Sequence, residues 1–382
     1  MSSHTEDARR RARRATLMLA LVALIWGTTF TLTPMICAGI DRLRIERLTP
    51  DERAQNLRPA TAAEIAALPD LPERFDIAAD WTGVYYCVVR FGVVVLLMAL
   101  WPRVWRQMNR RTIVYGFWLG LLMAVGFLTQ TVGLQRTTPA ISGFLTALYV
   151  PMTPLLVWLV WRRAPGWQLG LAVAFAFAGV VVMGLGGGTA AEAAAGATAD
   201  AIPFLGEILT IICAVAFAGH IVVVDWTSKR EGVIGLTWAM LAWTAILSAV
   251  PLPFFATSGA LFSTDLFAAT IVDWQVWPAM AFIALMPTFV CLLMVLHYQK
   301  DVEAARAGLV YATEPVWAMV FSLAFAREGW LATKLVGGGL IVAGNLVAEL
   351  RAAPPDDDPA GVVAAATGTA AGQEVVAVAD RN

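Results

Sequence analysis

The chain has 382 residues, of which 59% are hydrophobic and only 14% are charged, and its formal net charge is -1. A soluble domain carries about 25% charged residues, so this composition excludes an ordinary soluble protein. The apolar residues come in blocks of about 20, the length that a helix needs to cross a hydrocarbon core. We therefore expect an all-α integral membrane protein whose surroundings are the lipid bilayer, with no nucleic-acid partner.

The N-terminus combines a basic tail, residues 1–14, with an apolar run that extends to about Met35. Paired arginines before an apolar run resemble a signal peptide, but no small-x-small cleavage site follows the run. We therefore predict that this segment is the first membrane-spanning helix.

Ten spans are predicted along the chain. Their approximate ranges are 15–37, 82–101, 112–134, 139–161, 167–188, 204–226, 234–256, 274–297, 304–326 and 331–350. Lysine and arginine concentrate in the N-terminal tail and in every second joint between spans, whereas the other joints hold few of them, except residues 38–81, a long segment that holds several arginines but more acids. By the positive-inside rule, this alternation places both termini in the cytoplasm.

Residues 38–81 form an insertion between the first two spans, and the topology places it outside. Thr49–Glu52 and Thr61–Glu64 both have the capping-box pattern that starts a helix. We predict a small external cap of two short helices, with a disordered loop as the alternative. Cys37 and Cys87 lie near the two ends of the insertion. They either form a disulfide with each other or, in the better interpretation, are two buried thiols.

The two halves of the chain repeat each other. Residues 15–188 hold five spans, residues 189–203 form a linker, residues 204–350 hold five more, and residues 351–382 form a disordered cytoplasmic tail. The stretches 135–151 and 299–315 have equal length and both end at a proline inside a span. An odd number of spans in each half gives the halves opposite orientations, an arrangement that recurs in secondary transporters.

Several short motifs occur in a characteristic order. They are Trp26-Gly27, Arg90-Phe91, Ala147–Pro151, Gly206-Glu207, Ala307–Pro315 and Glu328-Gly329. Together they resemble the drug/metabolite transporter superfamily, in its EamA-type ten-helix branch, over roughly residues 15–350. The resemblance implies a multi-pass transporter of the cell inner membrane and favours efflux. The insertion at 38–81 and the Arg162-Arg163 pair depart from the usual pattern.

Glu314 is the main candidate site residue, because it lies about 10 residues from each end of the ninth predicted span. An ionised side chain at that depth costs at least about 2.5–3.5 kcal/mol, so it must face a polar interior. Either Glu314 binds substrate or a proton, or it makes a structural hydrogen bond, for example to a tryptophan indole or to Thr313. Pro315 follows it and interrupts the helix at the carbonyl of Tyr311, which joins the candidate site.

Pro151 stands in the matching place of the first half, where it should free the carbonyl of Ala147, and Pro154 should extend the break. Interrupted spans at corresponding positions of two halves indicate a central transport site. The alternative is a plain kink, since proline is common in membrane helices.

Three further residues complete the candidate site. Arg90 lies within the second predicted span and can bind an anionic group, pair with Glu314 or reach outward as a structural residue. If the two pair, Glu314 stays ionised; if they do not, burial favours its neutral form and makes it a proton carrier. His220 can titrate or be a satisfied core residue, and Trp26 can line the site or pack.

We therefore expect a secondary transporter that moves a small metabolite, such as an amino acid or an amphiphilic compound, by alternating access. No nucleophile with its base, metal-ligand cluster or nucleotide-binding loop is evident in the sequence, so we expect neither an enzyme nor a cofactor nor a metal. The sequence leaves open whether the protein forms a homodimer. The alternative function is a non-transporting scaffold or receptor that uses the external insertion.

Overall fold

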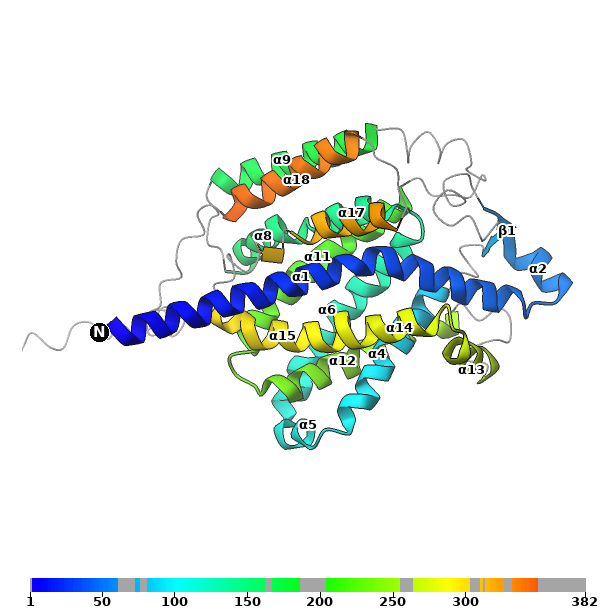
Figure 1. Ribbon diagram of the computed structural model, residues 1–382, viewed down its shortest axis with the longest axis horizontal. Coiled ribbons are helices and arrows are strands. Elements are labelled where there is room, and N and C mark those ends of the chain that lie inside the picture. Colours follow the sequence, from blue (N-terminus) through cyan, green and yellow to red (C-terminus); the bar gives the residue numbers. More distant parts are fainter. Residues whose placement is uncertain are drawn as a thin grey trace, which may run out of the picture. The chain divides into compact units, whose positions relative to one another are not determined.

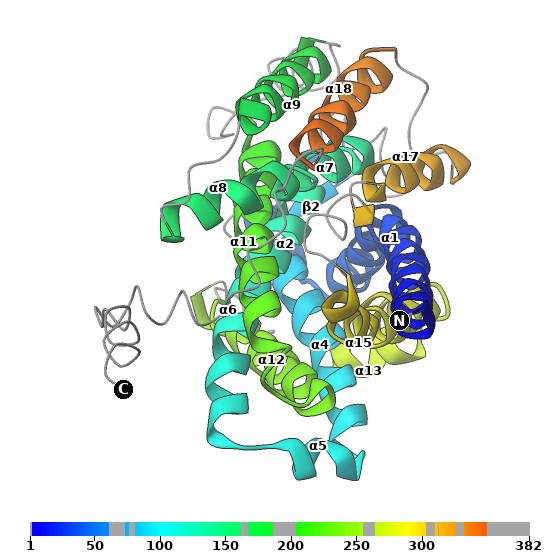
Figure 2. The same ribbon diagram turned by 90° about the vertical axis from the view of Figure 1, so that its left-hand side faces the viewer.

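The computed structural model describes residues 2–60, 73–75, 81–161, 167–185, 204–254, 264–302, 310–311, 313–325 and 332–349 (Figures 1 and 2). Almost all of these residues are helical. The longer helices are α1 (Ser2–Ile45), α4 (Thr82–Ala99), α6 (Arg110–Leu134), α8 (Tyr149–Trp161), α9 (Trp167–Leu185), α11 (Leu205–Thr227), α12 (Val233–Ala249), α17 (Glu314–Ala324) and α18 (Ala332–Glu349). The shorter ones are α2 (Pro50–Asn56), α5 (Pro102–Gln107), α7 (Pro139–Thr146), η1 (Leu252–Phe254), α13 (Thr264–Val272), α14 (Trp277–Ile283), η2 (Ala284–Val290), α15 (Cys291–Tyr298) and η3 (Gln299–Asp301).

Within the described residues, five helical stretches are long and apolar enough to cross a membrane. They are Arg10–Ile45, Thr82–Ala99, Arg110–Leu134, Leu205–Thr227 and Trp277–Asp301. The remaining predicted spans overlap other described helices, so a polytopic helical membrane protein is supported, while the total of ten spans stays a prediction.

Helix α1 is longer than predicted, because it continues past residue 37 to Ile45. Ile40 and Leu43 are buried at 0% and 6% exposure, so the stretch after Cys37 keeps an apolar face at helical spacing. The first part of the predicted insertion therefore belongs to this helix. Cys37 and Cys87 are both buried thiols, and they form no disulfide with each other.

The predicted helix start at Thr49 is confirmed. The N–H and the hydroxyl of Thr49 donate to the Glu52 carboxylate at 2.9 and 2.8 Å, and these bonds lower the pKa of Glu52. Helix α2 follows directly. The second predicted start, Thr61–Glu64, lies outside the described residues, as do the linker at 189–203 and the tail at 351–382.

An unpredicted pair of strands follows α2. Strands β1 (Leu57–Pro59) and β2 (Glu73–Phe75) run antiparallel, with Leu57 opposite Phe75. The prediction of an all-α chain is therefore wrong in this segment. Strands of three residues are too short to show the period of two by which a strand is recognised in a sequence.

Small residues let helices of the two halves approach closely. A Cβ atom placed on Gly116 of α6 would lie 2.6 Å from the Cβ of Ala239 on α12, and one on Gly120 would lie 2.7 Å from the carbonyl oxygen of Met240. Helices α9 and α18 are also neighbours, as Figures 1 and 2 both show, and Gly179 meets the backbone of Gly337 there. Close backbone approach of this kind is how membrane helices pack.

Candidate functional site

Glu314 is the first residue of α17, at a point where the helix starts afresh. The N–H of Thr313 donates to the carbonyl of Val310 at 3.2 Å, and the carbonyl of Thr313 accepts from Trp317 at 3.3 Å, so Thr313 is the turn before the helix. The break therefore lies at Pro315, and the carboxyl group stands at a helix N-terminus, where negative charge is favoured. Glu314 is only 8% exposed.

The first half has a break at the equivalent place. Helix α7 ends with Ala147 as its C-cap, and α8 begins at Tyr149, with Pro151 in its first turn. The carbonyl of Ala147 accepts from the N–H of Val150 at 3.1 Å, so it is not left free as the sequence suggested. Helix α8 continues through Pro154, which does not lengthen the break.

Four buried side chains from different elements surround the Glu314 carboxyl and interact with it electrostatically. They are Tyr149, Tyr311, Cys213 and Cys291. The Tyr149 hydroxyl is near enough to act on the carboxyl but makes no well-formed hydrogen bond within the described residues. Phenol and thiol groups thus form the polar part of this environment, together with the helix terminus.

Arg90 of α4 is buried, at 2% exposure. Its Nε donates to the hydroxyl of Thr288 at 2.6 Å, and one Nη lies 3.5 Å from the hydroxyl of Tyr86. Its guanidinium carbon lies 4.6 Å from the ring centroid of Phe127 and 5.3 Å from that of Phe91. In the part of the chain that the structure describes, no ion pair joins Arg90 to Glu314 or to another carboxylate.

The partner of Arg90 comes from a helix irregularity that the sequence reading missed. Between α14 and α15, the π-helix η2 contains Pro287, and the hydroxyl of Thr288 donates to the carbonyl of Ile283 at 2.9 Å. Proline lacks an N–H and disturbs the helical hydrogen bonds, and single π turns often occur at functional sites. The signal in the sequence was a proline near the middle of the eighth predicted span.

Trp26 and Tyr311 join this region. The indole of Trp26 donates to the carbonyl of Pro287 at 2.9 Å, and its ring centroid lies 5.7 Å from that of Tyr311. The hydroxyl of Tyr311 donates to Gln299 at 3.3 Å. Cys291 interacts electrostatically with both Arg90 and Glu314, so its thiol is near both of these buried residues.

His220 lies apart from this cluster. It is 8% exposed on α11, and its Nε2 is 3.3 Å from the sulfur of Met240. Within the described residues, no contact connects it to Glu314 or Arg90. This arrangement matches a satisfied core histidine better than a member of the site.

The cluster therefore combines two separate capabilities. A buried carboxyl group beside phenols and thiols, without a basic partner among the described residues, can hold and release a proton. A buried guanidinium held by hydroxyl groups and aromatic rings can bind an anionic group. The residues come from α1, α4, α8, α11, the η2–α15 segment and α17, which belong to both halves of the chain.

Comparison with known proteins identifies the family of the chain. The sequence profile of the EamA-like transporter family matches residues 80–185 and 204–349, which make up more than half of the chain. An uncharacterized transporter of Archaeoglobus fulgidus is 25% identical over 339 residues, covering 88% of this chain and 86% of the relative. A solved crystal structure shares the fold with a TM-score of 0.50 and 17% identity, covering 88% of this chain and 96% of the other. The chain belongs to the EamA-like transporter family.

Proposed function

We propose that the protein is a secondary transporter that moves a small metabolite across the cytoplasmic membrane by alternating access. Its family consists of membrane transporters, and the two matched segments correspond to the two halves of the chain. In this proposal each half contributes five spans in inverted orientation, both termini are cytoplasmic, and the substrate, an amino acid or an amphiphilic compound, is exported. The helix breaks at Pro151 and Pro315, in equivalent places of the two halves, support this arrangement.

The observation that carries the proposal is the environment of Glu314. The carboxyl is buried at a helix break, among phenols and thiols, and no basic side chain pairs with it in the described part of the chain. An ionised group without a countercharge is costly inside a membrane, so a protonated Glu314 fits the substrate-free state. Substrate binding then displaces the proton and couples transport to the proton gradient.

The other site residues have distinct roles in this proposal. Arg90 binds an anionic group of the substrate, while Trp26 and Tyr311 contribute aromatic surface beside Glu314. The predicted spans contain essentially no lysine and a single deep arginine. A phosphorylated substrate would call for several cations, so the site suits a substrate with at most one anionic group.

The experiment that tests the proposal is proton release from purified protein in detergent when candidate metabolites are added. We expect a compound that releases protons from the wild type and from His220→Gln but not from Glu314→Gln. His220→Gln is the matched control, because it changes a buried ionisable residue outside the cluster. If Glu314→Gln releases protons as the wild type does, Glu314 is structural and the proposed coupling is wrong.

A further inference from the structure

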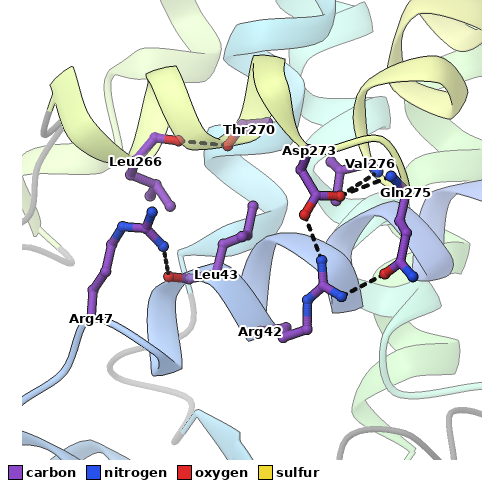
Figure 3. A network of polar contacts seen from close by, with 8 residues as sticks. All are labelled: Arg42, Leu43, Arg47, Leu266, Thr270, Asp273, Gln275 and Val276. Atoms are coloured by element: carbon purple, nitrogen blue, oxygen red, sulfur yellow. Dashed lines mark hydrogen bonds and ion pairs between the residues drawn. The ribbon is translucent and has the colours of Figure 1, made fainter.

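An ionic contact joins the two halves of the chain at the C-terminal end of α1 (Figure 3). One Nη of Arg42 donates to Oδ2 of Asp273 at 2.6 Å, and the other donates to the side-chain oxygen of Gln275 at 2.5 Å. Asp273 is mostly buried, with a side-chain exposure of 15%, and Arg42 is partly exposed at 38%. The backbones are close here as well, because a Cβ placed on Gly39 would lie 2.5 Å from Cγ2 of Val276.

Asp273 also accepts hydrogen bonds from the backbone, and these bonds fix the position of its carboxylate. Its other oxygen, Oδ1, accepts from the N–H groups of Gln275 and Val276 at 2.9 and 3.0 Å. These donors lie at the entry to α14, so the residue that binds Arg42 also caps the segment that continues into η2 and α15. The ion pair is therefore attached to the element that carries Thr288 and Cys291.

A second contact of the same design joins the halves after the end of α11. The Oε2 atom of Glu231 accepts from Nδ2 of Asn109 at 2.8 Å and from the hydroxyl of Thr112 at 2.7 Å. Asn109 is the N-cap of α6, and its Oδ1 accepts from the N–H groups of Arg111 and Thr112 at 2.8 and 3.0 Å. Here a residue that follows the C-terminus of α11 binds the capping residue of a helix in the other half.

The repeat relates these two contacts. Asn109 and Asp273 are separated in the sequence by the same number of residues as Pro151 and Pro315, so they occupy equivalent places in the two halves. Both lie between the second and the third predicted span of their half, and the side chain of each accepts from N–H groups of the turn that follows it. In the proposed inverted topology, equivalent places of the two halves lie at opposite faces of the membrane.

We propose that these contacts are the two gates of the transporter: Arg42 with Asp273 closes the outer access to the Glu314 site, and Glu231 with Asn109 closes the inner one. This inference rests on the proposed function, because a gate requires alternating access. Helix α1 lies beside α14 and α15 (Figures 1 and 2), and hydrogen bonds connect α1 to the segment that runs from Asp273 through η2. Trp26 with Pro287 connects them at the site, and Arg42 with Asp273 connects them at the outer end.

The two gates differ in chemistry. The outer one is an ion pair, whereas the inner one joins a carboxylate to a neutral amide and a hydroxyl. The outer gate is a partly buried ion pair, so salt outside the cell screens it only in part. Its closed state therefore depends on the charges of residues 42 and 273, which gives a direct test.

The test measures how fast a membrane-impermeant maleimide, added to intact cells, labels Cys291 in a variant whose other three cysteines are serine. Cys291 is fully buried beside Glu314, so labelling from outside reports opening of the outer path. Arg42→Glu places two carboxylates together and should increase the labelling rate about fivefold. Asp273→Asn keeps a good capping residue but loses the ion pair, so it should act in the same direction.

The double variant Arg42→Glu with Asp273→Asn is the decisive one. It recreates at the outer face the glutamate–asparagine pair that the inner gate uses, so the labelling rate should return to that of the parent. Arg47→Ala is the matched control, because Arg47 follows the same helix end and donates to the carbonyl of Leu43 in α1 at 2.5 Å. It should leave the labelling rate unchanged.

Two results would overturn the inference. One is an Arg42→Glu variant that is labelled no faster than Arg47→Ala, and the other is a double variant that is labelled as fast as Arg42→Glu alone. Labelling needs no substrate, so its outcome is separate from that of the proton-release experiment. If the labelling rates change as expected but no compound releases protons, the gate proposal is supported and the proposed proton coupling is contradicted.

Discussion

The indole nitrogen of Trp26 donates a 2.9 Å hydrogen bond to the carbonyl oxygen of Pro287, across 261 positions of the sequence. This bond joins α1 to the π-helix η2 at the point where η2 also presents Thr288 to Arg90. The donor, the acceptor and the irregular helix turn therefore depend on one another, and the position of Arg90 depends on all three.

The Trp26→Phe variant tests this dependence. Phenylalanine keeps an aromatic ring beside Tyr311 but loses the indole N–H, which should lower the free energy of unfolding by about 1 kcal/mol. The measurement is thermal unfolding of the purified protein, with Trp158→Phe as a control, because Trp158 is 44% exposed. Equal melting temperatures for the two variants would show that the bond to Pro287 does not support the site.

The Arg90→Met variant distinguishes a functional role of Arg90 from a structural role. Arg90 is buried without a carboxylate partner among the described residues, so its charge costs free energy that an apolar side chain of similar length avoids. We expect the free energy of unfolding to change by less than about 1 kcal/mol, while binding of a substrate with an anionic group is lost.

The two measurements for Arg90→Met are a denaturation curve and a substrate titration, with Arg90→Lys as the conservative comparison. Lysine keeps the charge but not the planar group that contacts Thr288 and the rings of Phe91 and Phe127, so it should bind substrate weakly. A loss of about 3 kcal/mol or more in Arg90→Met would instead identify Arg90 as a structural residue.

The features that the sequence revealed are those that depend only on residues close together in the chain. The capping box at Thr49 and the helix breaks at Pro151 and Pro315 follow from local backbone chemistry, and the unusual place of Glu314 is evident from its apolar surroundings. The role of Pro287 was missed, although a proline near the middle of a predicted span was a visible signal.

Other features depend on contacts between distant segments and leave no local pattern. The electrostatic interaction of Cys291 with both Arg90 and Glu314 joins three segments that are far apart in the sequence. The extension of α1 to Ile45 is stabilised by burial of Ile40 and Leu43, which a composition window treats as part of a polar insertion. Tertiary packing therefore decided what local propensity left open.

The contacts of Arg44 indicate how the external segment is anchored to the helices. One Nη of Arg44 donates to Thr82 and, at 3.3 Å, to Asp41, and its guanidinium carbon lies 3.6 Å from the ring centroid of Phe75 and 4.0 Å from that of Trp81. Arg44→Ala leaves the buried carboxylate of Asp41 without this partner, which should cost about 3 kcal/mol. Limited proteolysis should then cut within residues 57–81 faster than in the wild type.

The double variant Arg44→Ala with Asp41→Asn checks the cause of that loss. Asparagine removes the buried charge, so it should recover part of the stability and slow the proteolysis again. Arg47→Ala is the control for a general effect of losing a cation at this helix end. If the double variant is cut as fast as Arg44→Ala, the aromatic contacts of Arg44 anchor the segment rather than its charge.

We expect the Glu231→Ala variant to open the inner contact, whereas Arg42→Glu opens the outer one. Removing the acceptor of Asn109 and Thr112 weakens the inner contact, while Asn109 still caps α6 through its own oxygen. Labelling of Cys291 should become about threefold faster when the maleimide is added to inside-out vesicles, and it should stay unchanged or fall in intact cells. Asp225→Asn is the matched control, because it removes an exposed ion pair with Lys229, at 2.9 Å, within α11 and its C-terminal turn. A rise in labelling from both sides would show general loosening of the bundle, because a gate that closes one face must affect the two faces differently.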